Sequence, residues 1–363
     1  MDILHICSYY IGSWAYRGLI KGIGKTVKTN TVYVYTDNKS NSEYLNDENI
    51  VVSRCYPSIS RYLFYWKHML VVKDLSRKIN LADYHLIHAH SLFSNGYIAY
   101  KAKLKYGIPY IVNVSNTDLN YFFKRLPFLR PLGNKILDYA YKIVFISNPY
   151  LEKTINDYVY NKEEIRSKSY VIPYCIDDFW IENTKIKYNF VLQEELRLIF
   201  IGQVDKNKNT ETIIKACKLL IQRGFNVKFT IVGRIDKGMQ QDGSDFVHYI
   251  PHSSKEELMI LLRQSDIFIM PSRNETFGLV YPEAMSQGVP VIYTRGQGFD
   301  EHYADGEVGY SVDCNDPAEI ADKVELIVSD YERISRACVA RISDFRMENI
   351  ARRYKNIYNN SDD

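Results

Sequence analysis

The feature that most constrains this chain is a series of short apolar runs that alternate with segments of helical periodicity, and the series occurs twice. The first set of runs predicts strands at residues 2–8, 31–35, 86–88, 110–114 and 143–146. The second set predicts strands at residues 196–201, 227–232, 267–270 and 289–293. Amphipathic segments lie between the runs, at 97–106 and 133–141 in the first set and at 210–222, 255–264 and 279–287 in the second. Because such alternation is typical of βαβ units with a parallel sheet, we expect an α/β fold with two doubly wound domains.

The length of 363 residues agrees with two domains, because single hydrophobic cores stop growing at about 250–300 residues. We predict a Rossmann-like N-terminal domain at 1–178, a polar linker at 179–195 and a Rossmann-like C-terminal domain at 196–344. Residues 345–363 are expected to form a helix that crosses back to the N-terminal domain. Ligands of open α/β sheets bind beyond the carboxyl ends of the strands, so both domains are expected to face a central cleft. Two α/β domains without a shared site are the alternative at this point.

Composition limits the compartment and the partners. Six cysteines are scattered without a CxxC pair, so neither a disulfide framework nor a structural zinc site is expected. The start of the chain does not resemble a signal peptide, and no apolar run reaches the roughly 20 residues that span a bilayer, so we expect a cytoplasmic protein. Residues 1–180 hold 23 basic and 15 acidic side chains, and the remainder holds 23 basic and 28 acidic ones. This asymmetry favours an anionic partner for the first half, but it is too modest, without a recognition motif, to predict nucleic-acid binding.

The densest chemical signal is the segment PSRNETFGLVYPEAMSQGVP at residues 271–290. Glu275 falls in the loop after a predicted strand, and Glu283 falls just over one turn into the next helix. The amides of Gly278, Leu279 and Val280 would be unpaired donors at that helix start, which suits a diphosphate. Carboxylates beside a phosphate are explained if they accept hydrogen bonds from sugar hydroxyls, so a sugar nucleotide is the expected ligand. The alternative is a surface glutamate in the loop and a second one that only stabilises the helix N-terminus.

The two glutamates, spaced as E-x7-E and followed by AMSQGVP, resemble the signature of glycosyltransferase family 4. Similarity to this family extends over residues 86–103, 107–119, 170–179, 200–208 and 248–272. The resemblance implies the two-domain GT-B fold and a nucleotide-diphosphate sugar as donor, with UDP favoured. It also implies transfer of a hexose or N-acetylhexosamine with retention of anomeric configuration. In the front-face reaction that it implies, an oxygen of the donor phosphate receives the acceptor proton.

The resemblance also implies roles for single residues. Glu283 is expected to bind the ribose hydroxyls, Glu275 the hydroxyls of the donor sugar, and Lys208 the pyrophosphate. A cation at the last position would stabilise the departing diphosphate. The other residues implied on the donor side are Gly12, Gly202, Gln203, Gly233, Arg234, Ile250, Pro251, Phe277, Gly278 and Leu279.

Two positions depart from the family's pattern. Gln203 stands where an arginine usually assists the lysine, so Arg234 or Arg273 is a candidate to replace it. Ser115 stands where a histidine is expected near the transferred sugar. Ser115 or Asn116 is therefore expected to make that contact, or the choice of donor differs.

The acceptor side is expected to include His90 and Asp118. His88 and His90 share one face of a strand, but buried or acceptor-side histidines are favoured over a metal-binding pair. The chain has no Asp-x-Asp motif, and the adjacent Asp177 and Asp178 are predicted to lie in a solvated turn. We therefore expect no metal ion and no cofactor.

Two stretches, residues 61–78 and 121–142, combine large apolar side chains with lysine and arginine. Such segments bind an anionic leaflet peripherally, and the alternative is core helices with solvated faces. We expect a glycan or lipid-linked acceptor in surface polysaccharide synthesis of the bacterial type, at the inner face of the cell membrane. A non-hydrolysing sugar-nucleotide epimerase, or a non-catalytic scaffold or binding protein of the same fold, is the alternative function.

Overall fold

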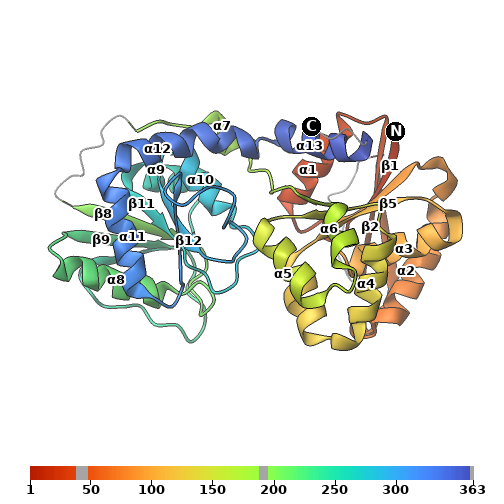
Figure 1. The fold of residues 1–363 in the computed structure, drawn as a ribbon, viewed down its shortest axis with the longest axis horizontal. Helices are drawn as coiled ribbons and strands as arrows, with labels where there is room; N and C mark the ends of the chain where they lie inside the picture. The colour runs from red at the N-terminus through yellow and green to blue at the C-terminus, as the bar shows by residue number, and fades with distance from the viewer. Residues whose placement is uncertain (38–47, 188–194, 360–363) are drawn as a thin grey trace. The chain divides into compact units, whose positions relative to one another are not determined.

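The computed structural model describes residues 1–37, 48–187 and 195–359. The chain divides into two compact units, whose helices and strands carry the labels of Figure 1. The first unit comprises Met1–Cys175 and Met347–Asp363, and the second comprises Ile176–Arg346. The last helix of the chain therefore belongs to the first unit.

The first unit is built on a seven-stranded parallel sheet with the order β3-β2-β1-β4-β5-β6-β7. Its strands are β1 (Asp2–Ile6), β2 (Thr29–Asp37), β3 (Ile50–Tyr56), β4 (Leu86–Ala89), β5 (Tyr110–Val114), β6 (Lys142–Phe145) and β7 (Ser169–Val171). Its α-helices are α1 (Trp14–Gly24), α2 (Phe64–Lys78), α3 (Ser94–Tyr106), α4 (Arg130–Tyr139), α5 (Asn148–Tyr158), α6 (Lys162–Ser167) and α13 (Met347–Asn359). Shorter turns are η1 (Ser58–Tyr62), η2 (Leu81–Asp83), η3 (Asp118–Phe123) and η4 (Pro127–Leu129). Strand order runs outward from β1 in both directions, so the sheet is doubly wound.

Apolar side chains cover both faces of this sheet. Neighbouring residues of one strand point to opposite faces, so Ile3 and Leu4 belong to two different core clusters. Helix α13 packs against α1 over one of these faces, as Figure 1 shows. A Cβ on Gly22 of α1 would lie only 2.7 Å from the side chain of Met347, so this glycine admits the start of α13.

The second unit has a six-stranded parallel sheet with the order β10-β9-β8-β11-β12-β13. Its strands are β8 (Leu196–Ile201), β9 (Val227–Val232), β10 (Val247–Ile250), β11 (Ile267–Ile269), β12 (Val291–Thr294) and β13 (Gly309–Val312). Its helices are α7 (Asp178–Glu182), α8 (Thr210–Gln222), α9 (Lys255–Gln264), α10 (Val280–Ser286), α11 (Pro317–Ser329), α12 (Tyr331–Ala340) and the short η5 (Arg341–Phe345). This sheet is doubly wound as well, with β8 and β11 at its centre.

The structure adds elements that the apolar pattern did not indicate. Strands β3, β7, β10 and β13 were not predicted, because each is short or partly exposed and lacks a continuous apolar run. Helix α7 lies in the segment that was predicted as linker, and it buries Trp180 and Ile181. Asp177 caps this helix rather than lying in a solvated turn, since its Oδ1 accepts a hydrogen bond from Phe179 N at 3.0 Å. No helix in the described ranges is long and apolar enough to cross a membrane.

Candidate active site

Three loops of the second unit meet at one edge of its sheet. They follow β9, β8 and β11, which are neighbours in the sheet and run parallel, so their carboxyl ends lie together. Lys208 lies in the loop after β8, Gly233 directly follows β9, and Glu275 lies in the loop after β11. The residues that the sequence predicted for the donor side of this unit thus gather at a single edge.

Lys208 and Glu275 form an ion pair between two of these loops, with 2.5 Å between Nζ and Oε2. Their side chains are only 22% and 12% exposed, so water screens the pair weakly. The amide of Lys208 donates to Asp205 Oδ1 at 2.8 Å, and Glu275 Oε1 accepts from Thr276 N at 3.0 Å. A fixed cation thus lies directly beside a fixed carboxylate, as a ligand with both phosphate and hydroxyl groups would require.

The loop after β12 braces the Glu275 loop. Gln297 Oε1 accepts a hydrogen bond from Glu275 N at 3.0 Å, and Gly298 N donates to Glu275 O at 3.1 Å. A Cβ on Gly298 would lie 1.8 Å from the carbonyl oxygen of Thr276. Only glycine allows the two backbones to approach this closely, so Gly298 helps to set the position of Glu275.

The turn into α10 contains the amides that were predicted to receive a diphosphate. Gly278 has a φ of +81°, and a Cβ there would lie 2.3 Å from the ring of Tyr281. Glu283 N already bonds to Leu279 O at 3.1 Å. The amides of Gly278, Leu279 and Val280 make no hydrogen bond with another residue of the described ranges, which leaves three donors available to an anion.

Glu283 is the fourth residue of α10 and is half-buried. Burial raises the pKa of its carboxyl to about 7, although the ammonium of Lys255 acts to lower it. Lys255 itself pairs with Asp177 at 2.5 Å, and the charge of Asp177 raises the pKa of Glu283 further. A carboxyl in such a poorly solvated place gains most from hydroxyl donors, which the ribose of a nucleotide would supply.

Gly202 and Gly233 lie against each other at the ends of β8 and β9. A Cβ on Gly233 would lie 2.0 Å from the carbonyl oxygen of Gly202, so backbone packing alone requires a glycine at position 233. Gly233 N donates to Ile250 O at 2.9 Å, which brings the end of β10 to the same place. The remaining predicted side chains at these strand ends are exposed: Gln203, Arg234 and Pro251.

The two candidates for the missing arginine differ in their surroundings. Arg273 Nη2 donates to Asn209 Oδ1 at 3.2 Å, and its Nη1 donates to Asn315. Arg273 therefore joins two loops together. Arg234 is exposed at the sheet edge, and its carbonyl oxygen accepts from Val204 N at 2.9 Å. Arg234 is the better candidate of the two to assist Lys208.

The side chain of Phe277 does not lie along the approach to the sugar. It is buried, and its ring lies 5.7 Å from that of Phe299, 5.2 Å from that of His302 and 5.8 Å from that of Phe345. Phe277 was predicted to lie along the sugar–phosphate approach, and aromatic packing takes its side chain into the core. Only its backbone remains to face a ligand.

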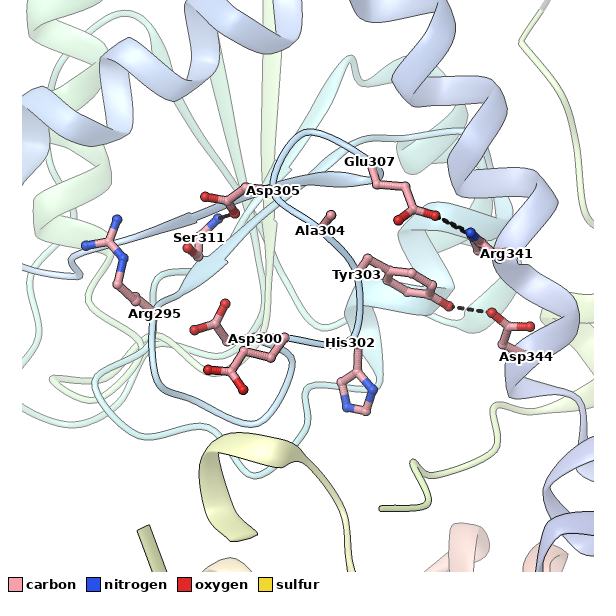
Figure 2. Close-up of a pocket in the computed structure, with 11 residues that line it drawn as sticks. Arg295, Asp300, His302, Tyr303, Ala304, Asp305, Glu307, Ser311, Arg341 and Asp344 are labelled. Atoms are coloured by element: carbon pink, nitrogen blue, oxygen red, sulfur yellow. Dashed lines mark hydrogen bonds and ion pairs between the residues drawn. The ribbon is translucent and has the colours of Figure 1, made fainter. Parts of the chain in front are cut away.

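An open hollow of about 730 Å³ lies beside this aromatic group, between the loop after β12 and η5. Figure 2 shows its carboxylates, two of which are paired within the hollow, Glu307 with Arg341 and Asp344 with Tyr303. Asp300 is also committed, since its Oδ2 accepts from Gly296 N at 2.6 Å. An acid-rich lining repels a diphosphate, so this hollow is less suited to an anion than Lys208 and the start of α10.

In the first unit, Asp118 is a structural clamp. Its carboxylate is buried and accepts four hydrogen bonds, from Leu92 N at 3.1 Å, Phe93 N at 3.0 Å, Ser115 N at 2.9 Å and Ser115 Oγ at 2.8 Å. These bonds join the loops after β4 and β5. The prediction that Asp118 contacts an acceptor is therefore corrected, because its oxygens are occupied.

The other predicted residues of the first unit lie near this clamp or in the first loop. The Ser115 hydroxyl donates to Asp118, and Asn116 is bonded to the side chain of Asn120. Both Ser115 and Asn116 are half-buried, so each has surface left for a ligand. Gly12 is exposed in the loop after β1, and a Cβ there would meet nothing within 4 Å. Packing does not require glycine at this position.

His90 is fully buried and does not face a ligand, which corrects the prediction for the acceptor side. Its ring stacks on His88 at 4.1 Å, and its Nε2 lies 2.9 Å from His5 Nδ1. His5 is the residue that sequence reasoning missed, because only the parallel register of β1 and β4 places His5 opposite His88.

The three buried histidines carry nitrogens close enough to hold a metal ion. Both nitrogens of His88 are already bonded, Nδ1 to Tyr358 Oη at 2.7 Å and Nε2 to Asn113 Oδ1 at 2.9 Å. A metal ion there would have to break one of these bonds without a carboxylate to balance its charge. The geometry therefore favours a neutral hydrogen-bonded group.

Comparison with known protein families agrees with this geometry. Residues 182–340 match the model described as glycosyl transferases group 1, and residues 28–178 match that of Glycosyltransferase Family 4. The two matches together cover most of both units, and the second-unit match includes Lys208 and Glu275.

The chain belongs to glycosyltransferase family 4.

Curated relatives of this glycosyltransferase family 4 protein match over part of their length. A capsular polysaccharide biosynthesis glycosyltransferase, CapM of Staphylococcus aureus, is 29% identical over 42% of this chain and 43% of its own. A D-inositol 3-phosphate glycosyltransferase of Pseudarthrobacter chlorophenolicus is 30% identical over 42% of this chain and 38% of its own. The matched part thus spans less than half the length of these relatives.

Solved structures are similar over nearly the whole chain. Sucrose-phosphate synthase of Thermosynechococcus elongatus has a TM-score of 0.75 at 16% identity, over 99% of this chain and 98% of its own. HepE of Anabaena, solved in complex with UDP, has a TM-score of 0.72 at 17% identity, over 99% of this chain and 100% of its own. At these identities the similarity concerns the fold, which is the predicted GT-B fold with two α/β domains.

Several residues that position the site were missed from the sequence. Asp205 orients Lys208, Gln297 holds Glu275, and Asn209 adopts a φ of +61° to turn the chain into α8. Asn209 is 4% exposed; its Oδ1 accepts from Thr212 in α8, and its Nδ2 donates to Cys314 O in the loop after β13. Asparagine before a helix is a turn signal that sequence reasoning can use, whereas the partners of Asp205 and Gln297 depend on the fold.

Proposed function

We propose that this protein is a retaining glycosyltransferase that transfers a hexose or N-acetylhexosamine from a nucleotide-diphosphate sugar, with UDP as the favoured nucleotide. The observation that carries the proposal is the Lys208–Glu275 pair beside the three unpartnered amides at the start of α10. This arrangement offers a cation and amide donors to a diphosphate, and a carboxylate to the sugar next to it. The family membership and the titles of the relatives support the same reaction class.

In the proposed mechanism, Glu283 accepts hydrogen bonds from the ribose, and Glu275 accepts them from the donor sugar. The diphosphate displaces Glu275 from Lys208 and is held by the ammonium and by the amides of Gly278 to Val280. The bond from the anomeric carbon to the phosphate oxygen then breaks, and the acceptor oxygen bonds to that carbon on the same face. The acceptor proton passes to the departing phosphate, whose charge Lys208 stabilises. No metal ion and no cofactor takes part in the proposed reaction.

A thermal-shift panel of UDP, GDP, ADP, CMP and dTDP, each with EDTA and with magnesium, tests the donor site. We expect one diphosphate, UDP, to raise the melting temperature equally under both conditions. A shift that requires magnesium would contradict the metal-free proposal. Absence of any shift would favour a non-catalytic protein, and conversion of a UDP-sugar without acceptor would favour an epimerase.

We further propose that the acceptor is a glycan or lipid-linked glycan of surface polysaccharide synthesis, reached at the inner face of the cell membrane. Support comes from an aromatic surface on the first unit, at η1 and the start of α2. Its members are Ile59, Tyr62, Leu63, Tyr65, Trp66 and Met69, which are between 39% and 77% exposed. Contiguous exposed apolar groups of this kind mark interaction sites.

The second predicted stretch adjoins this aromatic surface. The ring of Phe64 lies 6.0 Å from that of Phe122 in η3, and the neighbouring Tyr121 is 47% exposed. Lys124 and Arg125 are exposed directly after η3. Aromatic side chains beside cations suit the interface of an anionic membrane.

Sedimentation with vesicles that contain phosphatidylglycerol tests this contact. Because Tyr62 and Trp66 would insert at the interface, Y62A/W66A is expected to bind vesicles about tenfold more weakly than the wild type. The matched control is Tyr160→Ala, which removes a side chain that is 70% exposed elsewhere in the unit. Equal loss in both variants, or no binding by the wild type, would shift the proposal to a soluble acceptor.

A further inference from the structure

A basic groove lies on the first unit beside α1. The groove has a volume of about 610 Å³ and lies between α1 and the starts of β2 and β3. Arg17, Lys21, Lys25 and Lys28 line it, and no acidic residue of the described ranges does. At 1.5 Å per residue, Arg17, Lys21 and Lys25 follow one side of the helix over about 12 Å, and Lys28 lies in the turn that follows.

None of the four cations has an ion-pair partner within the ranges that the structure describes. Asp2 is the acidic residue whose carboxyl feels the charge of Lys28, and it already pairs with His85 at 3.1 Å. Arg17 and Lys21 lie four residues apart on α1, and like charges at that spacing destabilise a helix. Lys21 and Lys25 lie at the carboxyl end of α1, where a cation is favourable, but that effect is confined to the last turn. A bound anion would offset the mutual repulsion of the four cations.

The remaining lining determines which anions fit. Tyr10, Ile20, Val32 and Ile50 provide apolar surface, and Asn30 and Thr29 provide polar groups. A volume of this size is typical of small-molecule sites, and arginine with lysine is the usual set for phosphate. The groove is thus suited to a phosphate-bearing ligand that also has an apolar or sugar portion.

The groove reaches the loop after β1. Tyr10 belongs to this loop, and Arg17 Nη1 donates to Ile11 O at 3.0 Å, which ties the first cation to it. The same loop contains Gly12, which is exposed. A ligand in the groove would therefore extend from the carboxyl edge of the sheet, where ligands of such folds react, toward its amino edge.

We propose that this groove binds the phosphate groups of the acceptor substrate, at a site separate from the donor site of the second unit. That the ligand is the acceptor rests on the proposed glycosyltransferase function, whereas phosphate binding in the groove does not depend on that function. Phosphate on a lipid headgroup and phosphate on a soluble sugar have the same chemistry here, so the experiment must separate the two sources.

The test uses the full-length protein with UDP at saturation to block the donor site, and inorganic pyrophosphate as the probe in calorimetric titration. Because K21A/K25A removes two central cations of the groove, we expect it to bind pyrophosphate about tenfold more weakly than the wild type. The matched control is K101A/K105A, an equally spaced pair on α3 whose ammonium groups lie over Tyr97, Tyr100 and Tyr106. This control is expected to stay within about twofold of the wild type.

The same three proteins are then compared on vesicles that contain phosphatidylglycerol. Loss of pyrophosphate binding in K21A/K25A alone assigns the groove to soluble phosphates. Loss of vesicle binding alone, relative to the control pair, assigns it to a lipid headgroup. Absence of binding to both probes, or equal loss in both double variants, overturns the proposal. If UDP itself does not bind, the titrations are repeated with Lys208→Ala added to each protein, which removes the cation of the donor site. Failure of the groove and failure of the donor site then remain distinguishable.

Discussion

The two units differ most in what their charged side chains contact. In the second unit, arginines pair with carboxylates of the same unit, as Arg197 does with Asp266 at 2.8 Å and Arg223 with Asp322 at 2.8 Å. In the first unit, the cations of the groove have no such partner within the described residues, and six large apolar side chains are exposed at η1 and α2. Ion pairs also occur in the first unit, as between Arg166 and Glu152, so the difference lies in its basic groove and its aromatic surface, which we propose face a partner.

The hydrogen bonds of the polar residues discussed above show a similar difference. In the second unit, the half-buried Asp205 and Gln297 and the backbone of Gly298 bond to Lys208 or Glu275. In the first unit, the buried Asp118 joins two loops, and the buried His88 bonds to Asn113 and Tyr358. These groups of the first unit hold its fold together, and those of the second hold the candidate site.

The largest effect is expected from a variant that disrupts only the candidate site of the second unit. Lys208→Ala should lower turnover by about 10²–10³-fold, because the departing diphosphate loses its cation. The exposed neighbour Lys206→Ala is the control and should retain activity. Steady-state kinetics with a UDP-sugar measures both variants, and an unchanged rate in Lys208→Ala would remove the lysine from the mechanism.

The next effect concerns the stability of the first unit in acid. Burial lowers the pKa of His88 to about 4 and holds those of His5 and His90 well below the usual value. The unfolded chain binds protons to these histidines near pH 6.5, whereas the folded unit does not. The free energy of unfolding is therefore highest above pH 6.5 and decreases as the pH falls toward 4, by about 3 kcal/mol for His88 alone.

Hydrogen exchange of the β1 and β4 amides between pH 7 and 5 measures this loss in the first unit by itself. In the variant His5→Asn, the protection of these amides should decrease less as the pH falls. His252→Asn, which removes an exposed histidine of the second unit, should leave the slope unchanged. Equal slopes in the two variants would show that the buried histidines do not set the acid sensitivity.

A smaller effect is expected from a variant that disturbs the packing around the Glu275 loop of the second unit. Gly298→Ala should destabilise this unit by about 2 kcal/mol and lower activity, since the new Cβ would collide with the backbone at Thr276. Gly243→Ala meets nothing within 4 Å and should change neither property. Urea unfolding and kinetics of both variants check this, and a stable, active Gly298→Ala would show that the loop is not held as described.

The smallest effect is a pH dependence of donor binding. Because burial raises the pKa of Glu283 to about 7, its carboxyl is mostly protonated at pH 6 and mostly charged at pH 8. UDP should therefore bind about tenfold more tightly at pH 8 than at pH 6, as the charged form accepts from the ribose hydroxyls. In Glu283→Gln only the pH dependence that comes from the titration of UDP itself should remain. An equal pH dependence in both proteins would contradict the role of Glu283.

The central elements could be predicted because their signals are local, and the donor side stays a prediction that rests on an equally local motif. Strand β8 and helix α8 have the predicted bounds, since each carries its own apolar period. The Glu275 loop was predicted from a compact motif that lies within one strand–loop–helix unit. Edge strand β3 was missed, because its residues are partly exposed and do not repeat at a clear period.

What the sequence determined by itself is therefore the two α/β series, the E-x7-E loop at the end of one strand and the basic excess of the first half. Only the tertiary structure decided that His90, Asp118 and Phe277 turn inward, that His5 completes the histidine group, and that four cations of α1 and the turn after it line one groove. The physical reason is that periodicity shows which residues share a face of one element. The partner across that face depends on strand register and helix packing between segments far apart in the chain.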